Sequence, residues 1–189
     1  MILYYAHCRD TISSAQSRVF LYDCLTRFTG ELIAKATHPL KKTEFGKPYI
    51  EDFPLHFNLS HTDGLIICLV CDGYEVGVDC ERVRANHSQE RIAKRYFTDL
   101  ERAYIACSDD PTDAFYIIWT LKEAYIKCTG KGLSQGLSSF SAIGADCTIA
   151  DACNDKHFCT IENQIFDGYK IAACSSSEIT LIELVCINM

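Results

Sequence analysis

Residues 65–81 have the sequence LIICLVCDGYEVGVDCE, in which two strand-like runs flank an Asp-Gly pair. Leu65–Cys71 is an unbroken apolar run, the pattern of a strand that is buried on both faces. Over Glu75–Glu81, apolar residues alternate with others, which predicts a second strand. An Asp-Gly pair between two such runs is a strong signal for a β-hairpin, so we expect the chain to turn back at Asp72-Gly73.

The acidic residues at the end of this stretch, Asp79 and Glu81, should lie on one face of their strand. Side chains at positions i and i+2 of a strand leave the same face about 7 Å apart. Two carboxylates this close repel each other unless a cation lies between them. Hard divalent ions such as Mg²⁺ are bound by a few carboxylates together with phosphate oxygens. The pair therefore predicts part of a metal site for phosphoryl chemistry.

A third acidic residue, Glu123, lies in the segment with the clearest helical pattern. Asp110 and Pro111 fit the start of that helix, and Gly130 fits its end. One face is an apolar stripe, but the face with Glu123 also carries Trp119 and other apolar residues. We therefore expect the helix to be covered on both sides. A covered Glu123 needs a partner or a metal ion, because an isolated buried carboxylate is costly.

The lysines near Glu123 leave two interpretations open. Lys122 and Lys127, together with the three carboxylates, would complete a site for phosphoryl chemistry. A surface ion pair between Glu123 and Lys127 at i, i+4 spacing explains the helix taken alone equally well, although it is worth only about a few tenths of a kcal/mol.

The rest of the chain supplies further strands and helices on both sides of the opening stretch. Strands combined with helices in each half indicate an α+β fold. No low-complexity linker separates the halves, residues 1–84 and 85–189, so we expect one body with a cleft between them. We expect strands at Ile2–His7, His56–Ser60, Ser139–Ile143, Phe158–Glu162, Tyr169–Ser175 and Ile179–Cys186, and helices over about Ser14–Phe28 (ended by Gly30), across Ser88–Cys107 and at Pro111–Cys128.

The composition is that of a globular protein with a real core, since 48% of the 189 residues are hydrophobic and 23% are charged. The net charge of −7 argues against a nucleic-acid-binding protein, which usually has a strongly basic face. No apolar run reaches the roughly 18 residues of a membrane span. The N-terminus lacks the features of a secretory signal. We expect a cytoplasmic protein without nucleic-acid or membrane partners, and the two internal halves favour a monomer.

Twelve cysteines suggest a zinc or redox protein as another hypothesis. Cys68 and Cys71 form a C-x-x-C, but residues three apart on a strand point to opposite faces, which is poor geometry for chelation. Cys147, Cys153 and Cys159 recur every six residues near a histidine, a weak hint of zinc. We expect most of these cysteines to be small buried side chains in a reducing cell.

Several further residues have a structural and a chemical interpretation. Lys47 and Pro48 lie in a turn, and the pair Ser60-His61 follows a strand. Lys131 lies between two glycines in a loop that only loosely resembles a phosphate-binding one. The segment Thr98–Glu101 is a good capping box, which already explains Glu101. A basic cluster at Arg82, Arg84, Arg91, Lys94 and Arg95 is either a solvated helix face or a dock for an acidic partner.

Taken in order, these pieces resemble the phosphopantetheinyl transferases of the surfactin-synthetase-activating type. The resemblance runs from about Phe45 to near the C-terminus. The matching segments are Phe45-Gly46-Lys47-Pro48, Phe57-Asn58-Leu59-Ser60-His61, Gly77-Val78-Asp79-Cys80-Glu81, Arg95-Tyr96-Phe97 followed by Glu101, Trp119-x-x-Lys122-Glu123-Ala124-x-x-Lys127, Gly130-Lys131-Gly132-Leu133 and Gly168-Tyr169-Lys170.

The resemblance implies two similar α+β halves related by a pseudo-twofold axis, with coenzyme A bound between them. It implies Mg²⁺-dependent transfer of 4′-phosphopantetheine from coenzyme A to a serine of an acyl or peptidyl carrier protein, with release of adenosine 3′,5′-bisphosphate. The carrier protein would dock near Arg84, Arg91, Lys94 and Arg95. Fatty-acid, polyketide and peptide systems all remain open as its source.

The resemblance also implies roles for individual residues. Asp79, Glu81 and Glu123 match magnesium ligands, and Glu101 matches a proposed general base, with a metal-bound water as the alternative. Glu101, Glu123 and Lys127 would be the catalytic residues. The implied contacts to coenzyme A are Arg18, Lys47, Pro48, Ser60, His61, Lys122, Lys127 and Lys131.

This chain departs from the family pattern in its short N-terminal part, which lacks a Lys/Arg-rich helix that larger relatives place near the 3′-phosphate. A module that binds coenzyme A without catalysing transfer is the alternative on the same scaffold.

Overall fold

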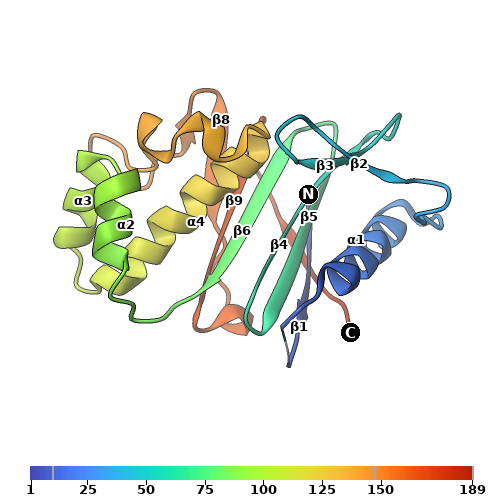
Figure 1. Cartoon of the computed structure of the whole chain (residues 1–189), viewed down its shortest axis with the longest axis horizontal. Coiled ribbons are helices and arrows are strands. Elements are labelled where there is room, and N and C mark those ends of the chain that lie inside the picture. Colours follow the sequence, from blue (N-terminus) through green and yellow to red (C-terminus); the bar gives the residue numbers. More distant parts are fainter. Residues whose placement is uncertain (10, 147, 189) are drawn as a thin grey trace.

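The computed structural model describes residues 1–9, 11–146 and 148–188, and these residues form a mixed α+β fold (Figure 1). Two four-stranded sheets pack against each other, and each is covered on its outer face by one long helix. No helix in the described residues combines the length and the apolar character that a membrane crossing requires.

The first sheet has the strand order β10-β1-β5-β4. Strands β4 and β5 form a hairpin, β1 pairs antiparallel with β5, and β10 pairs parallel with β1. Helix α1 begins at a capping box between Ser13 and Gln16. It ends at Gly30, as predicted, and this glycine has the left-handed conformation. The bounds are β1 Ile2–His7, α1 Ser14–Thr29, β4 Leu55–Thr62, β5 Leu65–Asp72 and β10 Glu183–Cys186.

The second sheet has the strand order β6-β9-β8-β7 and is covered by α4. Asp110 caps the start of α4 and Gly130 ends it, so both predicted helix boundaries are confirmed. Helices α2 and α3 pack against α4 at the end of the molecule opposite α1 (Figure 1). The bounds are β6 Val76–Arg82, α2 Gln89–Tyr96, α3 Asp99–Ala106, α4 Pro111–Thr129, β7 Ala152–Cys153, β8 Lys156–Thr160 and β9 Tyr169–Ser175.

A small hairpin and three short 3-10 helices complete the described structure. Strands β2 and β3 pair antiparallel on either side of the loop that carries Lys47. Strand β3 contacts β4, the edge strand of the first sheet. The bounds are β2 Leu40–Lys42, β3 Pro48–Ile50, η1 Gly132–Gln135, η2 Leu137–Ser139 and η3 Gln164–Phe166.

Helix α4 lies very close to β6 because β6 has a glycine at the contact. A Cβ atom on Gly77 would lie 2.1 Å from the carbonyl oxygen of Ala124 and 2.4 Å from the backbone nitrogen of Cys128. Only a residue without a side chain allows this approach. The close packing brings the α4 residues that follow Trp119 next to the acidic residues of β6.

Two expectations about strands are wrong, and a third is confirmed only in part. The turn at Asp72-Gly73 exists, with Gly73 at φ +83°, but β5 and β6 are not paired: the chain passes there from the first sheet to the second. Residues 139–143 are not a strand, although Ile143 forms an isolated bridge. The last predicted strand, Ile179–Cys186, is reduced to β10. Strand β6 belongs to the second sheet, and β10, although it is the last strand in the chain, belongs to the first.

The cysteines contribute to packing, as predicted. All eleven that the structure describes are free, and Cys68 and Cys71 lie in different core clusters on opposite faces of β5. The remaining member of the suggested zinc group, Cys147, lies outside the described residues. Within the described residues, no three His, Cys, Asp or Glu side chains form a ready-made metal site.

Candidate active site

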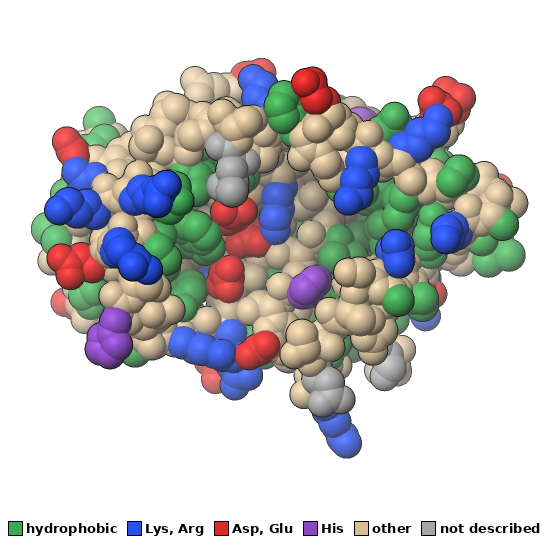
Figure 2. All heavy atoms as spheres, in the orientation of Figure 1, with side chains coloured by type: hydrophobic (Ala, Val, Ile, Leu, Met, Phe, Trp, Pro, Cys, Tyr) green, Lys and Arg blue, Asp and Glu red, His purple; other side chains and the backbone are tan. Residues whose placement is uncertain are grey.

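The candidate site lies where β4, β6 and α4 meet, beside the loop that precedes β3. A cavity of about 340 Å³ is lined there by Lys47 and Pro48 of the loop, Asn58 of β4, and Glu123 and Lys127 of α4. Acidic and basic side chains gather side by side in a hollow near the middle of this face of the molecule (Figure 2). The structure therefore brings together four of the predicted site residues from segments far apart in the sequence.

Asp79 is the centre of the polar contacts beside this cavity. It is only 5% exposed, and its Oδ1 accepts hydrogen bonds from Ser60 Oγ at 2.8 Å and from Lys127 Nζ at 2.6 Å. Its Oδ2 is buried and has no hydrogen-bond partner among the described residues. A buried carboxylate oxygen without a partner costs roughly 1–3 kcal/mol, and this oxygen is available to a ligand.

Lys127 is fully engaged by this cluster. Its ammonium donates to Ser60 Oγ at 3.0 Å and to the carbonyl of Val78 at 3.2 Å, besides Asp79. Burial lowers the pKa of Lys127, but the charge of Asp79 outweighs burial, so the net shift is upward. The ion pair of Lys127 is with Asp79 rather than with Glu123, so the surface-pair interpretation of α4 does not apply.

The carboxylates of Glu81 and Glu123 lie within electrostatic reach of Asp79. Burial raises the pKa of Glu123 to about 7, and the charge of Asp79 adds to the increase. Burial also raises the pKa of Glu81, and the charge of Asp79 adds to the increase. Glu81 and Glu123, both with a raised pKa, and Asp79, with its unpartnered oxygen, are the residues here that could hold a hard divalent cation. In the described residues these side chains are not already arranged as a metal site.

Lys47 is held by protein groups rather than pointing freely into the cavity. Its ammonium donates to Glu75 Oε2 at 2.5 Å, to the carbonyl of Val76 at 3.2 Å and to the carbonyl of Cys128 at 3.0 Å. These bonds use all three donors of the ammonium group. Lys47 therefore fastens its loop to β6 and to the end of α4, and so shapes the cavity wall.

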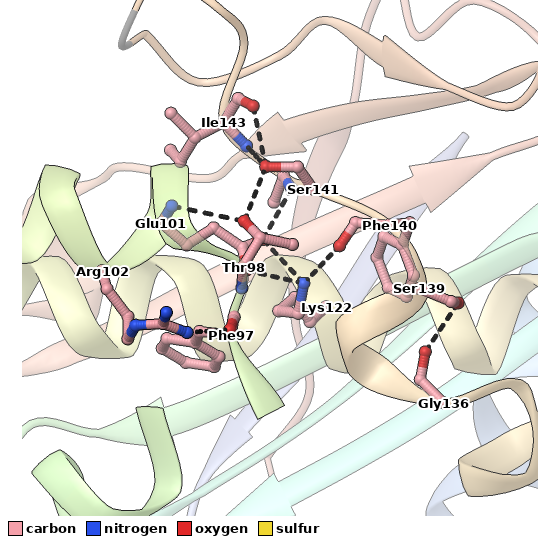
Figure 3. Close-up of polar contacts among 11 residues, drawn as sticks. Phe97, Thr98, Glu101, Arg102, Lys122, Gly136, Ser139, Phe140, Ser141 and Ile143 are labelled. Carbon is pink, nitrogen blue, oxygen red and sulfur yellow. Dashed lines mark hydrogen bonds and ion pairs between the residues drawn. The ribbon is translucent and has the colours of Figure 1, made fainter. Parts of the chain in front are cut away.

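Glu101 and Lys122 form a separate, completely buried pair (Figure 3). Both side chains are 0% exposed, and Lys122 Nζ lies 2.7 and 2.8 Å from the two oxygens of Glu101. Lys122 also donates to the carbonyl of Phe140 at 2.7 Å, and Glu101 accepts from the backbone nitrogens of Thr98 and Ala142. The predicted capping box is confirmed. Burial lowers the pKa of Lys122 against the opposing charge of Glu101.

Comparison with known proteins identifies the family. The profile of the 4′-phosphopantetheinyl transferase superfamily matches residues 75–174, more than half of the chain. The chain belongs to the 4′-phosphopantetheinyl transferase superfamily. The matched region contains β6, α4 and β9, and with them the three carboxylates and both ion pairs described above.

Several curated relatives resemble the chain over most of its length. It is 39% identical over 139 residues to the 4′-phosphopantetheinyl transferase Sfp of Bacillus subtilis strain 168. The matched region covers 70% of this chain and 61% of Sfp. It is 34% identical to gsp of Aneurinibacillus migulanus, over 71% of this chain and 57% of gsp. It is 32% identical to psf-1 of Bacillus pumilus, over 86% of this chain and 76% of psf-1. The chain thus spans about three fifths of Sfp and gsp.

Some of the site residues predicted from the sequence of this chain do not lie at the cavity. Arg18 is exposed on α1, and His61 and Lys131 are exposed as well. None of these three lines the cavity beside Glu123. Glu101 and Lys122 are sealed in their own pair. The residues that the structure brings together are Lys47, Pro48, Ser60, Asp79, Glu123 and Lys127, with Glu81 within electrostatic reach.

Two contributors were not singled out from the sequence. Asn58 lines the cavity, and its Oδ1 accepts a hydrogen bond from the backbone nitrogen of Val78 at 2.9 Å. Trp119, on α4, is near enough to Glu81 of β6 to lower the pKa of that carboxyl, against the larger effect of burial. Both residues lie inside motifs that carry the family resemblance, and those motifs were the available signal.

Proposed function

We propose that the protein transfers 4′-phosphopantetheine from coenzyme A to a serine hydroxyl of an acyl or peptidyl carrier protein, releasing adenosine 3′,5′-bisphosphate. The reaction is Mg²⁺-dependent, and the protein acts as a cytoplasmic monomer. The observation that carries this proposal is the unpartnered Oδ2 of Asp79, buried beside Glu81 and Glu123 at a cavity that also holds Lys127. Membership of the transferase family supports the reaction class.

Asp79, Glu81 and Glu123 would hold Mg²⁺. When bound, the ion offsets the negative charge that develops on the diphosphate during transfer. Lys127 contributes positive charge at the same place, and Ser60 orients Asp79 through its hydroxyl group. Phosphoryl transfer depends mainly on positioning and electrostatics, so no covalent protein nucleophile is needed.

The donor enters the cavity between the Lys47 loop and α4. Lys47 has no free donor, so its contribution to binding is the shape of the loop, while Pro48 and the backbone of the loop line the adenosine end. We propose that the pseudo-twofold relation of the halves places this donor cleft at their junction.

Glu101 is not assigned the general base in this proposal. A base must come within hydrogen-bond reach of the serine hydroxyl, and both oxygens of Glu101 are buried and occupied by Lys122, Thr98 and Ala142. Its role is to fix Lys122, and thus α4, against α3 and the segment that contains Phe140.

The carrier protein docks on the basic cluster next to Glu81. Arg84, Arg91, Lys94 and Arg95 are all exposed, and Arg84 already pairs with Asp63. Charge reversal at Arg91 or Lys94 should raise the KM for the carrier and leave the KM for coenzyme A unchanged, while Lys35→Glu, an exposed lysine outside the cluster, should change neither. If all three substitutions had equal effects, the carrier protein would not bind at this basic cluster.

The transfer reaction is tested by incubating the protein with coenzyme A, Mg²⁺ and a panel of apo-carriers from fatty-acid, polyketide and peptide systems, followed by intact-mass measurement. We expect one carrier or more to gain the mass of phosphopantetheine, and the gain to vanish with EDTA or in Glu123→Gln. Glu183→Gln, an exposed acid on β10, is the matched control. Coenzyme A binding without transfer to any carrier would favour the non-catalytic module instead.

A further inference from the structure

The two sheets meet at the edges of β4 and β6 without a backbone ladder between them. Strand β4 is an edge strand of the first sheet, and β6 is an edge strand of the second. A free strand edge presents unpaired backbone groups, and buried ones must find partners. At this junction side chains provide the partners.

Alternate residues of β4 accept hydrogen bonds from alternate backbone nitrogens of β6. Asn58 Oδ1 accepts from Val78 at 2.9 Å, and Ser60 Oγ accepts from Cys80 at 3.4 Å. Thr62 Oγ1 accepts from Arg82 at 3.4 Å, and the separation in sequence is 20 residues in all three cases. We call Asn58, Ser60 and Thr62 the β4 comb.

Lysine side chains complete the carbonyl side of the same edge. The ammonium of Lys47 donates to the carbonyl of Val76, and that of Lys127 donates to the carbonyl of Val78. A bond that runs through a side chain spans more than a direct backbone bond. The junction is therefore open enough to admit the Lys127 ammonium, which contacts both Ser60 and Asp79.

One hydroxyl of the β4 comb, that of Ser60, also contacts an acidic side chain of β6. Ser60 Oγ donates to Asp79 Oδ1 at 2.8 Å while it accepts from the next residue, Cys80. Thr62 contacts β6 two residues further on, where its Oγ1 accepts from the backbone nitrogen of Arg82, the residue after Glu81. Ser60 thus holds both the backbone of β6 and the carboxylate of Asp79, and Thr62 holds the backbone of β6 next to Glu81.

We propose that Asn58 and Thr62 are positioning residues that set the place of Asp79 and Glu81 for metal binding. Asn58 fixes the register of β6 against β4 ahead of Asp79, and Thr62 fixes the backbone of β6 directly after Glu81. This inference rests on the proposed function for its catalytic consequence, but the hydrogen bonds themselves are independent of it. Residues that orient metal ligands typically contribute about 10–100-fold to metal affinity or activity.

The test uses two pairs of variants of the full chain. Asn58→Leu and Thr62→Val remove the acceptor with little change in shape, whereas Asn58→Asp and Thr62→Ser retain it. Val185→Ala on β10, at the opposite edge of the first sheet, controls for a general loss of stability. Thr62 lies at the open end of β4, so Thr62→Val keeps the test available even where Asn58→Leu does not fold.

The first measurement is amide hydrogen exchange. We expect Asn58→Leu to speed exchange at the Val78 amide about tenfold, and Thr62→Val to do so at the Arg82 amide, by loss of the local acceptor. The amides of Gly77 and Asp79, which alternate toward β9, should be unchanged. Unchanged exchange at Val78 and Arg82 would show that Asn58 and Thr62 do not hold these amides, whether or not the protein is a transferase.

The second measurement is Mn²⁺ binding without substrates, followed by electron paramagnetic resonance. Thr62→Val should raise the Mn²⁺ dissociation constant about tenfold, and Thr62→Ser should restore it. In the transfer assay, the Mg²⁺ concentration for half-maximal rate should rise in parallel while the KM for coenzyme A stays the same. Equal Mn²⁺ affinity in Thr62→Val and Thr62→Ser would overturn the positioning role. Absence of transfer by the unsubstituted protein would overturn the proposed function alone.

Discussion

Helix α4 carries two lysine–carboxylate pairs that differ in how completely their hydrogen bonds are satisfied. In the Lys122–Glu101 pair both side chains are 0% exposed, and every ammonium donor and both carboxylate oxygens have partners. In the Lys127–Asp79 pair the lysine side chain is 26% exposed, and one carboxylate oxygen has no partner among the described residues. The hydrogen bonds of the first pair are complete, whereas the second leaves one carboxylate oxygen available to a ligand.

This difference in hydrogen bonding distinguishes a structural ion pair from a candidate functional one on the same helix. A buried ion pair is tolerated when additional hydrogen bonds satisfy its remaining atoms, and this is the state of Lys122 and Glu101. A buried oxygen left unpaired is retained at a cost when something binds to it. The family motif contains both lysines, but only Lys127 lies at the cavity.

The largest expected effect concerns the complete pair. Lys122→Met leaves the Glu101 carboxylate buried without its cation, so the free energy of unfolding in urea should fall by about 3–5 kcal/mol. Lys35→Met, at an exposed lysine, should change it little. The double variant Glu101→Gln/Lys122→Met should recover much of the loss. If Lys122→Met were as stable as Lys35→Met, the two pairs would not differ in the way we describe.

The next effect concerns the incomplete pair. Mg²⁺ should stabilise the protein against unfolding, by about 2.7 kcal/mol at a concentration 100 times its dissociation constant. Thermal denaturation with and without Mg²⁺ measures this shift. The shift should persist in Glu183→Gln and disappear in Glu123→Gln. Equal shifts in both variants would place the ion elsewhere.

A smaller effect follows from the raised proton affinity of Glu123. Its pKa is raised from the usual 4.5 to about 7, so in this range the folded chain holds a proton that the unfolded chain has released. Without metal, stability should therefore fall as the pH rises from about 4.5 to about 7, by roughly 1–3 kcal/mol. Urea unfolding at several pH values should show this fall in the unsubstituted protein and a flatter profile in Glu123→Gln. A stability that instead rises over this range would contradict the buried, metal-free cluster of carboxylates.

Local sequence patterns predicted the elements whose signals are themselves local. The caps of α4 at Asp110 and Gly130, the strand Tyr169–Ser175 and the shared face of Asp79 and Glu81 all depend on residues close together in the chain. The burial of both faces of α4 was likewise predictable, because apolar residues accompany its charges all around the helix.

The errors arose where distant groups compete for backbone partners. An Asp-Gly turn fits a hairpin and a change of sheet equally well, and the partner of β6 is β9, far along the chain. The stretch around Phe140 is apolar and buried like a strand. Its Phe140 carbonyl and Ala142 nitrogen bind Lys122 and Glu101 instead of a neighbouring strand.

The chemistry of the site was predictable in kind but not in arrangement. The three carboxylates were identified from their spacing and from the family motif. That Lys47, Lys122 and Lys127 direct all their donors to protein atoms depends on contacts between segments that are remote in sequence. The complete burial of Glu101 and its pairing with Lys122 are likewise properties of the assembled fold.

The central claim is tested most directly by measuring unfolding free energy and transfer rate together in Asp79→Asn and Glu101→Gln. We expect Asp79→Asn to lose about 10²-fold or more of transfer, with stability within about 1 kcal/mol of the parent. We expect Glu101→Gln to lose about 3 kcal/mol of stability and to retain most of the transfer rate per folded molecule. Full transfer by Asp79→Asn, or a stable Glu101→Gln that transfers nothing, would contradict the account.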